Sequence, residues 1–331
     1  MSQHPLTWAI GLVMAAAGAS YLKALWLLLT HLNAAQNGAG HQQALTKAAL
    51  LGRWTMGLQA AAFILVLAGV TNLWVSVVPG AMCGSGVLQA MGAAGRQFLI
   101  LMAATLVLFY CWRAVEVLDR GHTKALPADL QSRWLLLIAP FMILAFWRGI
   151  EALRAAGRQG PVSCCALLYD QLRDTGRLGT IFNFSISGHT WLLLSLSLTL
   201  FMAGRGLRWW RRPALAGKGV IIACGAGLVL WWVALYQGLT LEVAPYIYQT
   251  RFHPCPWCLF LADHKAVGLI YFGLPAWATL ECVAALTVWG VSRRYPQAAE
   301  PARRRLRQAG WRIALSALLF GLSAAWPILF G

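Results

Sequence analysis

The sequence predicts an all-α, polytopic integral membrane protein, and three observations carry this prediction. First, 59% of the 331 residues are hydrophobic and only 11% are charged, a composition typical of chains whose main solvent is lipid. Second, apolar runs recur that reach about 20 residues, the helical length needed to cross a hydrocarbon core of roughly 30 Å. Third, these runs lack the alternating pattern of a membrane β-barrel, and the backbone within lipid must be satisfied by a helix or a closed sheet.

We expect about eight transmembrane helices in a single helical domain over residues 1–331, with no separate soluble domain. In chain order, the apolar runs cover residues 5–31, 54–78, 97–118, 134–153, 188–206, 219–240, 266–290 and 311–330. The small residues at 15–18 are expected to permit close helix packing. No motif recurs along the chain, so the sequence gives no sign of an internal duplication.

Lys and Arg residues predict the orientation of these helices. The formal net charge is +17, and the basic residues concentrate in the connections after the first, third, fifth and seventh helices, above all at 208–212 and 303–307. Under the positive-inside rule these connections are cytoplasmic, and both termini face the periplasm of a bacterial inner membrane. Basic clusters at a bilayer edge act as orientation signals against anionic lipid, so we expect the lipid bilayer, not nucleic acid, as the partner of this charge.

Five cysteines fall in the connections that this topology places on the oxidising, periplasmic side. They are Cys83, Cys164, Cys165, Cys255 and Cys258. The other three, Cys111, Cys224 and Cys282, lie within expected helices and are interpreted as small buried hydrophobes. The distribution predicts redox or metal chemistry on the periplasmic face.

Cys255 and Cys258 form a Cys-x-x-Cys pair just before the seventh apolar run. Two thiols one helical turn apart can close a disulfide or share a metal ion. Pro256 suits the first turn of a helix, which places Cys255 at the helix start, where the helix dipole and the nearby Arg251 and His253 favour a thiolate. We expect Cys255 to be the nucleophile and Cys258 to be its resolving partner.

The residues around this pair predict where a cofactor would meet the thiols. Trp257 and His264 belong to a short amphipathic stretch at the bilayer surface. A quinone headgroup at that depth would contact Arg251, His253, Trp257 and His264.

This arrangement resembles quinone-linked thiol oxidoreductases of the DsbB and vitamin K epoxide reductase types, which carry a Cys-x-x-Cys pair at the membrane edge beside a quinone and shuttle cysteines in an external loop. Cys255 and Cys258 match the membrane-edge pair, and Cys83 with Cys164 or Cys165 matches the shuttle. Those families use a compact bundle of about four helices, whereas this chain predicts eight. The resemblance implies electron transfer between a periplasmic thiol protein and a quinone, in either direction.

The adjacent cysteines, Cys164 and Cys165, leave the disulfide connectivity open. Neighbouring cysteines close a strained ring and more often bond to another partner. Either could bond to Cys83, as a structural cross-link between two loops or as a shuttle that exchanges during turnover.

Metal or haem handling is the main alternative to thiol redox chemistry. His253, Cys255, Cys258 and His264 offer donors for copper or zinc, with His189 and Cys164 or Cys165 nearby in the same topology. A periplasmic metalloprotein or cytochrome would then be the partner. A structural or anchor subunit of a respiratory complex is a further alternative.

Two other features of the sequence have the residue types of functional sites. The Ser187-Gly188-His189 tripeptide is similar to part of a phosphatase motif of the type 2 phosphatidic acid phosphatases, but the remaining elements of that motif do not follow, so Ser187 is predicted to cap the fifth helix. Glu281 lies deep in the seventh helix. It either carries protons or bonds a neighbouring helix.

Overall fold

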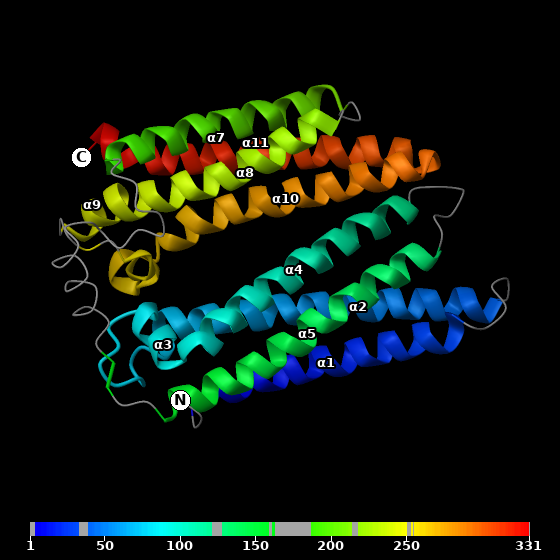
Figure 1. Ribbon diagram of the computed structural model, residues 1–331, viewed down its shortest axis with the longest axis horizontal. Coiled ribbons are helices and arrows are strands. Elements are labelled where there is room, and N and C mark those ends of the chain that lie inside the picture. Colours follow the sequence, from blue (N-terminus) through cyan, green and yellow to red (C-terminus); the bar gives the residue numbers. More distant parts are fainter. Residues whose placement is uncertain are drawn as a thin grey trace. The chain divides into compact units, whose positions relative to one another are not determined.

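The computed structural model describes residues 4–32, 39–120, 128–158, 161–162, 187–213, 218–249, 253 and 255–330. Within these ranges the regular secondary structure is entirely helical (Figure 1). Eight of the described helices are long and apolar enough to cross a membrane. The all-α prediction and its eight apolar helices are therefore confirmed.

The chain divides into two compact units. Unit 1 comprises Met1–Ala81 and Gly86–Val162, and unit 2 comprises Met82–Ser85 and Ser163–Gly331. The four-residue segment Met82–Ser85 thus belongs to unit 2 although unit 1 residues flank it in sequence. The prediction that the chain acts as one domain is not tested by this division.

Unit 1 contains four long helices and two short elements. In chain order these are α1 (Pro5–Leu32), α2 (Ala39–Ala68), the π-helical turn η1 (Gly69–Leu73), α3 (Gly84–Ala90), α4 (Gly92–Arg120) and α5 (Ala128–Ala156). A buried cluster that includes Tyr21, Phe109 and Trp112 joins α1 to α4. The glycine at 52 permits this packing, because a Cβ there would lie 2.7 Å from the Trp112 ring.

Unit 2 repeats this order of elements, with extra short helices before its third long helix and one more before its fourth. It contains α7 (Gly188–Arg211), α8 (Lys218–Gly238), the π-helical turn η2 (Leu239–Val243), α9 (Ala244–Tyr248), the 3-10 helices η3 (Pro256–Phe260) and η4 (Ala262–His264), α10 (Gly268–Arg294), η5 (Pro296–Ala298) and α11 (Ala299–Phe330). In both units the second long helix is followed by a π-helical turn, Gly69–Leu73 in unit 1 and Leu239–Val243 in unit 2. The sequence predicted no repeat; the structure shows one at the level of element order.

Helix ends differ from the predicted apolar runs for a simple physical reason. The second helix begins at Ala39 instead of 54, and the last at Ala299 instead of 311. Both extensions are rich in Ala, Gln, Lys and Arg, which favour helix even in water. At the start of α7, Ser187 accepts a hydrogen bond from the Thr190 amide at 3.3 Å, which confirms the predicted cap.

Apolar side chains cover much of the outer surface of the long helices. Leu12, Leu200 and Leu322 are 70%, 67% and 71% exposed, as are many other large hydrophobic residues on these helices. Contiguous apolar surface of this extent is unfavourable in water and compatible with contact to a lipid bilayer.

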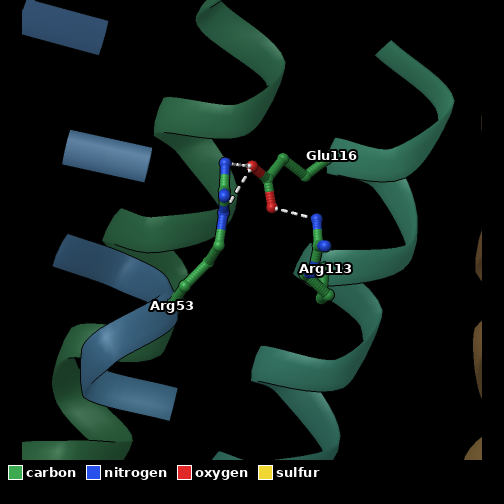
Figure 2. A network of polar contacts seen from close by, with 3 residues as sticks. All are labelled: Arg53, Arg113 and Glu116. Atoms are coloured by element: carbon green, nitrogen blue, oxygen red, sulfur yellow. Dashed lines mark hydrogen bonds and ion pairs between the residues drawn. The ribbon is translucent and has the colours of Figure 1, made fainter. Parts of the chain in front are cut away.

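Each unit buries one glutamate between two arginines. In unit 1, Glu116 of α4 accepts hydrogen bonds from Arg53 of α2, at 2.5 and 2.9 Å, and from Arg113, at 2.6 Å (Figure 2). Glu116 is 2% exposed, so the pairing compensates the cost of removing its charge from water. The sequence did not single out this glutamate.

In unit 2, Glu281 of α10 is fully buried and paired with α11. Arg305 Nη1 lies 2.8 Å from Glu281 Oε2, and Arg312 Nη1 donates to Glu281 Oε1 at 2.8 Å. Of the two predicted roles, bonding to a neighbouring helix is the one that the structure shows.

Candidate functional site

Three cysteine sulfurs meet in unit 2. The Sγ atoms of Cys83, Cys255 and Cys258 all lie within 4.8 Å of one another, and Cys83 Sγ is 3.7 Å from Cys255 Sγ. The three residues are 1%, 4% and 7% exposed. Residues separated by 172 positions in the chain thus form one buried three-sulfur cluster.

The 3-10 helix η3 places the Cys-x-x-Cys pair. Cys255 is the residue directly before this helix, with extended backbone, and Pro256 is its first residue, as the sequence predicts. Cys258 lies one turn further on. The hydroxyl of Tyr248, the last residue of α9, donates to the Cys255 carbonyl at 2.7 Å, which ties the pair to the end of the preceding helix.

A tight turn precedes Cys83. Gly80 has a φ of +79°, and a Cβ there would lie 2.1 Å from the Val162 carbonyl oxygen, so glycine is required on both conformational and steric grounds. The Val162 amide donates to the Pro79 carbonyl at 3.0 Å. The chain is therefore fixed three residues before Cys83.

Hydrogen bonds among the sulfurs give the three thiols different acidities. Donation from Cys258, then from Cys83, then from the backbone amides of residues 257 and 258 lowers the pKa of Cys255 well below its usual range, against the opposing effect of burial. The reciprocal hydrogen bond to Cys255 raises the pKa of Cys258 and that of Cys83. This order of acidity favours Cys255 as the thiolate of the cluster, and its role as the nucleophile stays a prediction.

His253 lies beside the second sulfur of the pair. Its Nε2 is 3.2 Å from Cys258 Sγ, and burial lowers the pKa of its imidazole. A lowered pKa favours the neutral ring, which can act through hydrogen bonding or as a ligand. The ring of Tyr248 separates the two predicted histidines, with centroid distances of 5.1 Å to His253 and 4.6 Å to His264.

The structure brings together some of the predicted site residues and leaves others apart. Cys83, Cys255, Cys258 and His253 share one site, and Trp257 packs against the three sulfurs. His264 contacts the site through Tyr248. His189 lies on α7 and pairs with Glu242 at 3.1 Å. Cys164, Cys165 and Arg251 lie outside the described residues.

Tyr248 is the site residue that the sequence analysis missed. It packs against the three cysteines and both histidines, yet it precedes the Cys-x-x-Cys pair by seven residues and belongs to no recognisable motif. A tyrosine at the outer end of an apolar run is usually interpreted as an interfacial anchor, so no local signal pointed to it.

The cluster can perform two kinds of chemistry. Three adjacent thiols can hold one disulfide and exchange it with the third sulfur. The same sulfurs, with His253, can also supply the donors of a zinc or Cu(I) site. Comparison of the chain with protein-family models, with curated proteins and with solved structures found no match.

Proposed function

We propose that this chain is a multi-pass membrane protein of a bacterial inner membrane that passes electrons between periplasmic thiols and a membrane quinone. Cys255 and Cys258 are the proposed redox pair, and both termini and the cluster face the periplasm. The observation that carries the proposal is the position of Cys83, whose sulfur lies 3.7 Å from that of Cys255.

The proposed step balances as a two-electron exchange. Oxidation of the two thiols to a disulfide releases two electrons and two protons, and a quinone that takes up both becomes the quinol. The disulfide then passes to Cys83, because the third thiol can attack Cys255 and release Cys258. The sequence of events can run in reverse, with quinol as the reductant.

The burial of the three sulfurs constrains how a protein partner exchanges with them. Exposures between 1% and 7% leave no room for the thiol of a second protein to approach without movement of the chain. A shuttle thiol on a connecting segment would meet this need, and Cys164 and Cys165 stay the predicted candidates for it.

The organisation of unit 2 supports the comparison with the quinone-linked thiol oxidoreductases. Its four long helices, α7, α8, α10 and α11, equal the size of the bundle in those families, so eight helices in the whole chain are no objection to the resemblance. The Cys-x-x-Cys pair lies before the third of them, beside the aromatic residues Trp257 and Phe260 that pack at 6.0 Å.

The test is a turnover measurement on the purified, reduced protein with a decyl-substituted benzoquinone. We expect quinol to form with one intramolecular disulfide per chain. Cys255→Ser and Cys258→Ser should each lose this activity, whereas Cys282→Ser, which alters a buried helical thiol outside the cluster, should retain it. Absence of quinol with the wild-type protein, or undiminished turnover by Cys255→Ser, would overturn the proposal.

Metal binding is a second candidate function, favoured by the compact set of three sulfurs and by the His253 nitrogen 3.2 Å from Cys258. A structural zinc site uses four such donors. Metal analysis of the same preparation separates the two functions. One zinc or copper per chain, lost in Cys83→Ser and in His253→Ala, supports the metal site; reduced protein without metal and with quinone turnover supports the redox site.

A further inference from the structure

Unit 1 contains an open apolar groove between α1 and α5 that the proposed redox site does not use. Its volume is about 440 Å³, within the range of roughly 300–1,000 Å³ that is typical of sites for small molecules. The centre of the α1 wall is formed by Ala15, Gly18 and Ala19, with the larger Met14, Tyr21 and Leu22 around them. The three small residues share one helix face because they are spaced three and four residues apart, and their short side chains leave space at this point.

The opposite wall of the groove is large and apolar. Met142, Phe146 and Trp147 of α5 line it, and Phe146 and Trp147 are 47% and 59% exposed. The small residues at 15–18 were expected to allow close helix packing. Ala17 is indeed buried at 1%, whereas Ala15 and Gly18 border this open space.

One polar side chain lines this apolar groove without a partner. Gln59 of α2 is 2% exposed, and its amide forms no hydrogen bond to any described residue. The other polar group nearby, the Tyr21 hydroxyl, donates to the Leu135 carbonyl. An amide that borders an apolar groove and forms no hydrogen bond within the protein is unfavourable, so the Gln59 amide identifies where a polar atom of a ligand would be stabilised.

We infer that this groove binds a lipophilic quinone, with the quinone carbonyl accepting a hydrogen bond from the Gln59 amide and the apolar ring substituents lying along α1 and α5. Gln59 lies near the middle of the membrane-spanning segment Gln43–Leu73, where the headgroups of bilayer lipids do not reach. A molecule that is apolar apart from carbonyl oxygens matches both the wall and the depth. The choice of a quinone rests on the proposed function, but binding here requires no turnover.

The experiment uses a photoreactive decyl-benzoquinone, with label mapped by mass spectrometry on the full-length protein in detergent. Label is expected on residues 14–22 and 142–147. Gln59→Leu should weaken binding roughly fivefold, the loss of about one hydrogen bond. Gly18→Leu should abolish labelling because its side chain would enter the groove. A Cβ at Gly18 meets no atom within 4 Å, and an unchanged thermal unfolding midpoint checks that the variant folds.

Gly57→Leu is the matched control, since this α2 glycine also has open space around its Cβ and does not line the groove. Its labelling should equal that of the wild type. Decylbenzene, which lacks carbonyl groups, serves as competitor. The inference would be overturned if decylbenzene and unlabelled quinone reduced the labelling equally and Gln59→Leu did not change it. The groove would then bind acyl chains without recognising a carbonyl group. Cys255→Ser should lose turnover and keep its labelling, since groove binding does not use the thiols. Labelling of the wild type without turnover would overturn the redox proposal alone, and wild-type turnover without labelling of the groove would overturn the groove alone.

Discussion

The cysteine cluster makes a direct prediction about which sulfurs bond when Cys258 is removed. In Cys258→Ser, the only described thiol close to the Cys255 thiolate is that of Cys83, at 3.7 Å. Mild oxidation should therefore trap a disulfide between Cys83 and Cys255. The bond would join two parts of the chain that are 172 residues apart.

The size of this loop sets the expected effect on stability. In the chain-entropy treatment, a cross-link that closes a loop of 172 residues adds about 5 kcal/mol to the free energy of unfolding, whereas the short loop between Cys255 and Cys258 adds about 2 kcal/mol. The oxidised variant should accordingly resist unfolding better than its own reduced form, by a margin larger than oxidation gives in Cys83→Ser.

The assay introduces a protease site in the connection between α7 and α8, so that Cys83, Cys164 and Cys165 stay on one fragment and Cys255 on the other. After cleavage, oxidised Cys258→Ser should run as one species on a non-reducing denaturing gel and as two after reduction. Adding Cys83→Ser should separate the fragments under both conditions. Fragments that separate without reductant in Cys258→Ser would refute the assigned proximity of Cys83, and fragments still joined in the double variant would assign the bond to another cysteine.

Three further predictions follow from the same geometry. Cys258→Ala removes the main hydrogen-bond donor to Cys255, so the Cys255 pKa should rise toward that of an ordinary thiol, measured as thiolate absorbance against pH. In the wild-type protein the Cys255 pKa is lower in the folded than in the unfolded state. The stabilisation from the Cys255 thiolate is therefore present above the unfolded pKa and lost as the pH falls through the folded pKa. Glu281→Leu removes the buried carboxylate that pairs with Arg305 and Arg312 and should lower the free energy of unfolding by about 3–5 kcal/mol, measured by denaturant titration in detergent. Gly206→Ala would place a Cβ 2.6 Å from a backbone oxygen of α11 and should destabilise the protein by about 1–3 kcal/mol, measured by thermal unfolding.

Each of these substitutions has a matched control. Cys111→Ala removes a buried helical thiol and should leave the thiolate titration unchanged. Glu300→Ala breaks an exposed pair with Arg304 and should change stability by less than about 1 kcal/mol. Gly204→Ala alters α7 where a Cβ meets nothing within 4 Å; equal destabilisation by both glycine substitutions would contradict the proposed clash.

The sequence predicted those features that depend on local pattern. Helix number and approximate positions followed from apolar run length, and the position of Cys255 before a short helix followed from Pro256. The meeting of Cys83 with Cys255 could not be derived in the same way. This contact depends on the path of the chain after the turn at Gly80, which the hydrogen bond from the Val162 amide to the Pro79 carbonyl fixes. That path determines where Cys83 lies.

Pairings between distant helices were likewise beyond sequence reasoning. Glu281 was recognised as needing a partner, but neither Arg305 nor Arg312 could be chosen from spacing alone. The sequence gives no indication of a role for Gln59, because a glutamine in an apolar run is ordinary until the structure places it in the wall of a groove. The repeated order of elements in the two units also left no recurring motif in the sequence.

The closeness of the three sulfurs has a consequence for resistance to oxidative damage. A thiolate that reacts with peroxide becomes a sulfenic acid, and further oxidation to sulfinic and sulfonic acids destroys it. At Cys255, a second thiol lies 3.7 Å away, so condensation to a disulfide with loss of water competes with any second attack by peroxide. Since the site is also nearly closed to solvent, peroxide damage there would end at a bond that a cellular thiol reductant can reverse.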